Sequence, residues 1–194
     1  MKSNAIKSSL LVLLILFVSN ASFAQFEQKF TFQAAGGYVQ ALQPEFFSDV
    51  FNNGFSLDAG AQYNFSRSFS IVALAKYSTY FAKDEGFVLG DIEYNLIGIS
   101  LCPKFKFFTG SRLNPYLYGG GSLNYYTFKL PGMDFPWEMK LGFSGGVGFD
   151  FRLNDNIGLF LQGGLNGVNG SDEMFLALYS QIGINISMFK SKTL

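Results

Sequence analysis

The stretch LGFSGGVGFDFR, residues 141–152, decides the fold. Large apolar side chains alternate in it with small or polar ones at every second position. The stretch FSLDAGAQYNF, residues 55–65, and the segment 157–166 repeat this alternation. A period of two is typical of a β-strand that has one apolar face and one small or polar face.

The same alternation, followed along the chain, predicts about eight strands, at 28–40, 55–65, 69–81, 94–108, 115–128, 140–153, 157–166 and 175–189. Most reach ten residues, which suits a tilted transmembrane strand of about 9–11 residues. The fifth is ambiguous in phase, so the sequence does not assign its two faces.

The connections between these strands alternate in length. Turns at 66–68, 109–114 and 154–156 are short, whereas the links at 41–54, 82–93, 129–139 and 167–174 are longer. Short turns at one end and long loops at the other are typical of bacterial outer-membrane barrels. The sequence therefore predicts an all-β fold, an eight-stranded antiparallel up-and-down transmembrane β-barrel.

The N-terminus has the three-part pattern of a secretory signal peptide. Lys2 and Lys7 precede an apolar run at 10–18, and small residues stand at Ser22 and Ala24. This pattern predicts that residues 1–24 are cleaved and that 25–194 form the outer-membrane β-barrel domain.

The charge of the chain indicates which kinds of partner and surroundings it can have. Without Lys2 and Lys7 the chain carries 12 basic and 14 acidic side chains, a net charge of −2, so we expect no nucleic-acid partner. Charged residues are 14% of the chain against about 25% in a typical soluble domain, which favours a surface that faces lipid.

Two residue types limit the possible chemistry. The chain has no histidine, which is the commonest general base and metal ligand, and Cys102 has no second cysteine with which to form a disulfide. We therefore expect no enzyme activity, no metal site and no cofactor.

The orientation of the two faces separates a membrane barrel from a soluble one. A soluble carrier would place the apolar face inside, around a cavity. Here the polar face carries few charges, and aromatic residues gather toward the strand ends, where a membrane interface would place them. We expect the apolar face to point outward, with Phe55, Leu57, Phe149 and Leu159 facing lipid.

The last predicted strand, QIGINISMF at 181–189, places a polar residue, a glycine two positions later and then alternating apolar residues. This pattern resembles the C-terminal signal that the outer-membrane assembly machinery recognises, and it is carried by Gln181, Gly183, Ile186, Met188 and Phe189. The chain continues to Leu194, whereas such signals often end at an aromatic residue.

Several of these features together resemble the OmpA/OmpX-like family of small outer-membrane β-barrels. They are the signal peptide, the eight strands, the NPY entry at 114–116 to a Gly-rich strand, FDFRL at 149–153 before a tight turn, and the C-terminal signal. The resemblance covers essentially all of the chain after residue 24. It implies a monomer in the bacterial outer membrane, with both termini in the periplasm and with membrane lipid and lipopolysaccharide as neighbours.

Charged residues are predicted on the inner face of the barrel. Register counted outward from the turn at 66–68 places Asp58 opposite Lys76. Lys104, Lys106, Asp150 and Arg152 are also expected inside, near the short turns. The six form either a salt-bridge network that fills the barrel or an ion path, and the narrow interior of eight strands favours filling.

Two of the long links are unusually apolar. The first holds Phe46, Phe47 and Phe51, and Pro44 is predicted to open a short helix there; the third holds Phe135 and Trp137. Exposed apolar clusters usually mark a contact, which here would be a partner, the lipopolysaccharide head groups or the barrel's own rim.

The function that the sequence favours is that of a non-enzymatic integral outer-membrane protein, contributing to envelope structure or surface interaction through its loops. Two alternatives stay open. One is a narrow pore for water or small ions, and the other is a soluble, lipocalin-like periplasmic carrier.

Overall fold

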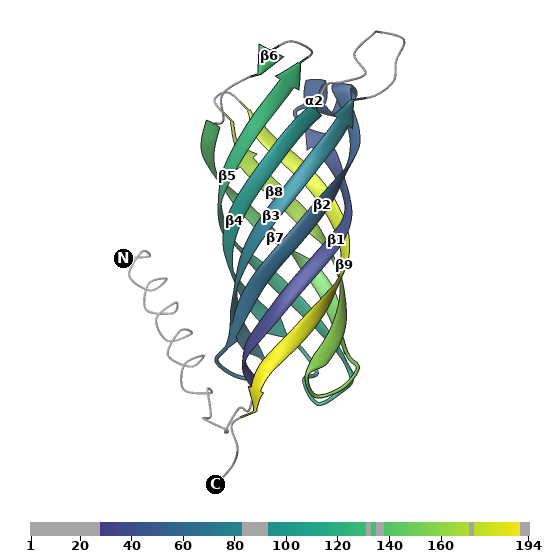
Figure 1. Ribbon diagram of the computed structural model, residues 1–194, viewed down its shortest axis with the longest axis vertical. Coiled ribbons are helices and arrows are strands. Elements are labelled where there is room, and N and C mark those ends of the chain that lie inside the picture. Colours follow the sequence, from purple (N-terminus) through teal and green to yellow (C-terminus); the bar gives the residue numbers. More distant parts are fainter. Residues whose placement is uncertain (1–27, 83–92, 131–132, 135–137, 171–172, 191–194) are drawn as a thin grey trace, which may run out of the picture.

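The structure is a computed structural model that describes residues 28–82, 93–130, 133–134, 138–170 and 173–190. Eight long strands form a barrel, and a short helix and a two-residue strand lie at one end of it (Figure 1). The elements are β1 (Gln28–Gln43), α2 (Glu45–Val50), β2 (Phe51–Asn64), β3 (Phe69–Ala82), β4 (Glu93–Lys106), β5 (Leu113–Leu130), β6 (Met133–Asp134), β7 (Glu138–Arg152), β8 (Ile157–Asn169) and β9 (Met174–Lys190). The predicted signal peptide lies outside the described residues.

The barrel is closed. Each long strand pairs antiparallel with its neighbours in the chain, and β1 also pairs with β9, from Gln28 opposite Lys190 to Gln43 opposite Leu176. Backbone N–H and C=O groups have no water to bind in hydrocarbon, so closure provides partners that an open edge would lack. The predicted eight-stranded up-and-down barrel is confirmed.

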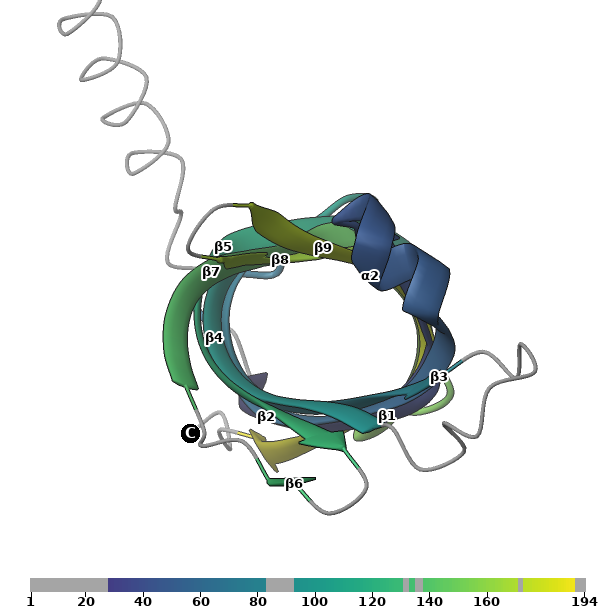
Figure 2. The same cartoon turned by 90° about the horizontal axis from the view of Figure 1, so that it is seen from above.

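The two ends of the barrel differ. The short connections at 65–68, 107–112 and 153–156 lie at the end where β1 begins and β9 ends, which we call the short-turn end (Figure 1). Side chains hold these turns: Phe69 N donates to Ser66 Oγ over 2.9 Å, and Ile157 N donates to Asn154 Oδ1 over 2.8 Å. The helix α2 lies at the opposite end, the loop end, on the rim of the barrel opening (Figure 2).

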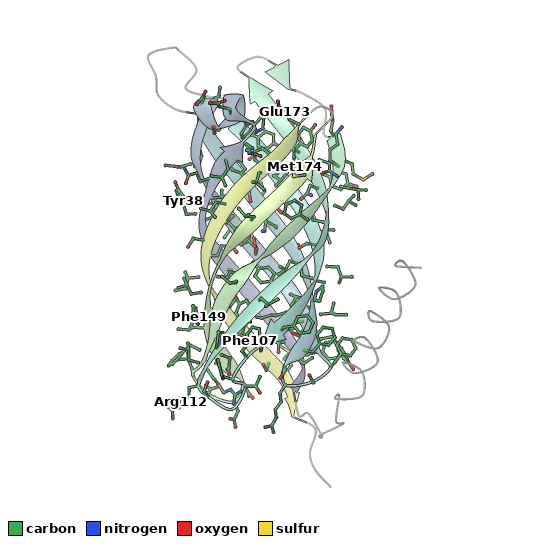
Figure 3. The ribbon with its side chains drawn as sticks, turned by 180° about the vertical axis from the view of Figure 1, so that it is seen from behind. Tyr38, Phe107, Arg112, Phe149, Glu173 and Met174 are labelled. Atoms are coloured by element: carbon green, nitrogen blue, oxygen red, sulfur yellow. The ribbon has the colours of Figure 1, made fainter. Side chains whose placement is uncertain are left out.

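The outer wall is apolar. Ile99, Val147 and Ile182, near the middle of their strands, are 61%, 64% and 64% exposed. The side chains predicted to face lipid are all exposed as well, namely Phe55, Leu57, Phe149 and Leu159. Figure 3 shows side chains projecting from the wall along the barrel. No helix in the described part of the chain is long and apolar enough to cross a membrane.

The interior is mostly polar, since polar side chains outnumber hydrophobic ones among the described residues that are buried. In β5, whose phase the sequence left open, Tyr116, Tyr118 and Asn124 are buried while Leu117 and Tyr125 are exposed. A polar interior and an apolar exterior are the reverse of a soluble carrier barrel. The lipocalin-like alternative with an apolar cavity is therefore wrong.

Aromatic side chains form an outward-facing girdle near the short-turn end. Phe30 packs edge-on against Tyr63, with ring centroids 5.1 Å apart, and Tyr63 packs against Phe65 at 4.8 Å. Other exposed rings near this end are Phe32, Phe107, Phe108, Phe149 and Phe151. Aromatic girdles of this kind flank the apolar band of membrane barrels.

Glycines make room for the large side chains that point into the lumen. Gly148 pairs with Tyr116, and Gly183 pairs with Phe160. A Cβ atom added at Gly183 would lie 2.4 Å from Phe160 Cζ and 2.4 Å from the backbone oxygen of Ala34. A glycine opposite a ring lets both fit inside a narrow barrel.

Gly183→Ala is expected to lower the free energy of unfolding by about 1–3 kcal/mol, because the added methyl group overlaps a ring and a backbone oxygen. Gly121→Ala is the matched control, since a Cβ atom at Gly121 meets nothing within 4 Å. Denaturant unfolding of both variants in lipid vesicles measures the difference. Equal losses in the two would contradict the packing described for Phe160.

Ile99→Arg is expected to lower the free energy of unfolding in lipid vesicles by about 2–4 kcal/mol, because it places a charge in the middle of the apolar wall. Ile99→Ala, which removes the same side chain without adding charge, should cost much less. If the two variants unfold at the same denaturant concentration, this wall does not face hydrocarbon.

Candidate functional site

The lumen is the candidate site, and one buried ion pair lies near its centre. Asp58 on β2 is directly opposite Lys76 on β3, as register from the turn at 66–68 predicts, and Lys76 Nζ is 3.8 Å from Asp58 Oδ2. The same ammonium lies 3.9 Å from the ring centroid of Tyr179 on β9. The ammonium of Lys76 thus interacts both with the carboxylate of Asp58 and with the aromatic face of Tyr179 across the lumen.

A second charged cluster lies toward the short-turn end, around Asp150. Lys106 Nζ is 2.6 Å and Lys104 Nζ 3.3 Å from Asp150 Oδ2, while Asn185 Nδ2 donates to Asp150 Oδ1 over 3.1 Å. Lys104 Nζ also lies 3.6 Å from the ring centroid of Tyr116. One carboxylate therefore joins side chains from β4, β7 and β9.

Arg152 differs from the other five charged residues predicted inside. It is exposed at the last residue of β7, because strand pairing ends there and the chain turns. It lines a small hollow of about 70 Å³ at the mouth of the barrel, together with Lys106 and Asn154. Arg152 therefore lies on the predicted inner side, but at the mouth of the barrel and not in its buried interior.

A chain of hydrogen bonds crosses the middle of the lumen. Tyr116 Oη donates to Gln162 Oε1 over 3.0 Å, Gln162 Nε2 donates to Gln181 Oε1 over 2.7 Å, and Gln181 Nε2 donates to Ser56 Oγ over 2.9 Å. The four side chains come from β5, β8, β9 and β2. Most of these strands are not neighbours, so the bonds brace opposite parts of the wall.

Tyr118 and Tyr179 form a further bridge at this level. Their hydroxyl groups are hydrogen-bonded across the lumen, although β5 and β9 are separated by two strands. Neither tyrosine stands out in the sequence as a candidate site residue. In β5, Tyr116 and Tyr118 are two residues apart, which indicates that they share one face of the strand. Because large aromatic rings are unusual on an otherwise small or polar face, the sequence did not show which face of β5 points into the lumen.

Five aromatic side chains, which we call the aromatic plug, pack together at the loop end of the lumen. Phe47 on α2 stacks on Phe51 with centroids 4.5 Å apart, and packs edge-on against Tyr94 at 4.7 Å and Phe175 at 4.8 Å. Tyr80 lies beside Phe175 at 5.6 Å and is fully buried. The plug joins α2 to β2, β3, β4 and β9.

The plug changes the interpretation of the first apolar link. The predicted short helix is present as α2. Phe47 and Phe51 pack against buried side chains of the barrel and do not form an exposed apolar surface. This is the rim contact that the sequence left as one of three possibilities. The Phe46 side chain, Phe135 and Trp137 lie outside the described part of the structure.

The residues of the predicted assembly signal lie on β9, the strand that closes the barrel against β1. Gln181 is buried in the lumen, while Ile186 and Met188 are exposed on the outer wall. Gly183 lies beside Phe160, and the side chain of Phe189 is outside the described set. Recognition of this strand by the assembly machinery stays a prediction.

The remaining reactive group inside is a cysteine. Cys102 is fully buried, with its Sγ atom donating to the backbone oxygen of Ser144 over 3.7 Å. Within the described ranges, no group of three or more His, Cys, Asp or Glu side chains could hold a metal ion.

Small outer-membrane barrels are among the solved structures that share this architecture. Neisserial surface protein A has 18% identity and a TM-score of 0.65, with 84% of this chain and 100% of that chain covered. Ail, the attachment invasion locus protein of Yersinia pestis, has 16% identity and a TM-score of 0.51, with 84% and 100% covered. The N-terminal β-barrel domain of Pseudomonas aeruginosa OprF has 18% identity and a TM-score of 0.50, with 83% and 100% covered.

At sequence identities this low, the similarity to these structures shows the fold alone. No family model matches the sequence, and no curated protein does. The chain has the fold of a small transmembrane β-barrel, as its resemblance to OmpA/OmpX-like proteins implies.

Asp58→Asn and Lys76→Gln are each expected to destabilise the barrel, because each leaves one buried charge without its partner. The double variant should recover part of the loss, with a coupling energy of about 0.5–3 kcal/mol in a double-mutant cycle measured by urea unfolding in lipid. Losses that add within about 0.3–0.5 kcal/mol would show that the two charges do not interact.

Proposed function

We propose that this chain is an integral protein of a bacterial outer membrane that neither catalyses a reaction nor conducts ions, and that acts at the cell surface through its loop end. Both termini would lie in the periplasm, because β1 begins and β9 ends beside the short turns. The observation that carries the proposal is the combination of an apolar outer wall with an interior filled by its own side chains.

The filled interior supports a structural role over a pore. Three barriers follow one another along the lumen: the lysines around Asp150, the Tyr118–Tyr179 bridge and the aromatic plug. An eight-stranded barrel has little interior space beyond its side chains. The polar lining is the observation in favour of the narrow-pore alternative, but water or an ion would have to displace the plug to pass.

We expect the loop end to be the part of the protein that contacts partners at the cell surface. It carries exposed acidic side chains, and its aromatic plug holds α2 on the rim. Contact with lipopolysaccharide, passage through the assembly machinery and a monomeric state are parts of this proposal. Two similar structures are, by their names, a surface protein and an attachment protein, which fits a role outside the membrane.

Membrane fractionation tests the location. The full chain, expressed with its N-terminus intact, is expected in the outer-membrane fraction and to migrate differently on a denaturing gel before and after boiling, since a closed barrel resists detergent. Recovery as a soluble periplasmic protein would overturn the proposal.

Planar-bilayer recording tests the filled lumen. The purified barrel is expected to give no current steps, because an eight-stranded barrel has little interior space beyond its own side chains. A large porin inserted under the same conditions is the positive control. Discrete single-channel currents from this barrel would favour the narrow pore instead.

A further inference from the structure

The loop end carries most of the negative charge of the chain. The links that join the strands there hold ten of the 14 acidic residues and two of the 14 basic residues, a net charge of −8, at 41–54, 82–93, 129–139 and 167–174. A surface with this excess of one sign attracts partners of the opposite sign and repels partners of its own. The loop end therefore favours a cationic partner.

A hollow of about 580 Å³ lies at this end, where β1 finishes beside the start of β9. Gln43, the last residue of β1, pairs with Leu176, and Met174 is the first residue of β9. Figure 3 shows Glu173 and Met174 at the loop end. The hollow is lined from both segments, by Leu42, Gln43, Pro44, Glu45, Glu173 and Met174.

Part of the lining is apolar and accessible. Leu42 is 38% exposed and Met174 is 44% exposed, and one comes from each side of the hollow. A methionine side chain is flexible and adapts to apolar groups of different shape. The hollow can therefore accept an apolar side chain of a partner.

Two carboxylates line the same hollow, Glu45 at the start of α2 and Glu173 directly before β9. Both are exposed, and within the described ranges neither forms a salt bridge. Glu138 at the same end differs, because Lys140 Nζ lies 3.5 Å from its Oε2 atom. Glu45 and Glu173 thus present negative charge that no described side chain offsets.

The aromatic plug holds the two sides of the hollow together. Phe47 of α2 packs against Phe175 of β9, with ring centroids 4.8 Å apart. Phe47 lies two residues after Glu45, and Phe175 directly follows Met174. A site whose sides are already held in place loses less conformational freedom when a ligand binds.

We propose that this hollow binds a basic polypeptide segment of a partner outside the cell. Lysine or arginine side chains of the segment pair with Glu45 and Glu173, and an apolar side chain contacts Leu42 and Met174. The inference names the kind of partner for the surface role proposed above, and it rests on that proposed function. Lipopolysaccharide phosphates have the same sign of charge as the two carboxylates, so they would reach this hollow only through a divalent cation.

The test is peptide binding to the full-length barrel in phosphatidylcholine nanodiscs, followed through the amide NMR signals of the isotope-labelled protein. The peptide Lys-Leu-Lys, acetylated and amidated so that its ends are uncharged, is compared with Lys-Ser-Lys and Glu-Leu-Glu. Lys-Leu-Lys is expected to shift the signals of the lining residues, to bind more tightly than Lys-Ser-Lys and to lose affinity as salt is added. Glu-Leu-Glu should not bind.

Glu45→Gln and Glu173→Gln are each expected to weaken the binding of Lys-Leu-Lys by up to about fivefold, which is the contribution of one exposed ion pair. The double variant should lose more than either single variant. Glu138→Gln is the matched control, because it removes a carboxylate at the same end that already pairs with Lys140, and it should change the affinity much less.

Three results would overturn the inference: no binding of Lys-Leu-Lys to the wild type, equal binding of Glu-Leu-Glu, or an equal loss in Glu138→Gln and the double variant. Binding of lipid A in the presence of Mg²⁺, without binding of Lys-Leu-Lys, would also overturn it and would assign the hollow to lipopolysaccharide. Heat-modifiability of each sample separates the two proposals. A barrel that inserts but binds no basic peptide contradicts only this inference, whereas a chain that does not insert contradicts the proposed membrane location.

Discussion

Closure of β1 against β9 is the constraint on which the rest of the structure depends. In hydrocarbon, a backbone N–H or C=O group without a hydrogen-bond partner costs several kcal/mol. The last long strand, β9, therefore has to pair with the first, β1. Once the ring is closed, the number of strands and their stagger set the diameter. The diameter then determines which inward side chains fit, and Gly183 beside Phe160 is one result of that limit.

The narrow diameter also explains why polar side chains can be buried here. Charged groups inside a protein are tolerated when partners surround them. Across this lumen such partners are only a few ångströms away: Asp150 reaches lysines and an asparagine from two other strands, and Gln181 reaches Ser56. The same contacts tie non-neighbouring strands together, so the lumen replaces the hydrophobic core of a soluble domain.

The two ends of the barrel have become different surfaces. At the loop end, aromatic rings pack around Phe47 and hold α2 on the rim. At the short-turn end, arginines are exposed in or beside the turns, and phenylalanines are exposed on the outer wall. Because the wall between them is mainly apolar, we expect specific recognition to lie at the two ends.

The sequence by itself determined the strands, the outward faces of all of them except β5, and the pairing of Asp58 with Lys76. Alternation with a period of two shows directly which residues share a face of a strand. In two antiparallel strands joined by a tight turn, residues at equal distances from the turn are paired. Only the tertiary structure decided which residues meet across the lumen, such as Tyr118 with Tyr179, and that Phe47 turns inward. Those contacts join segments that are not paired, so they depend on the diameter and stagger of the closed barrel, which no local pattern encodes.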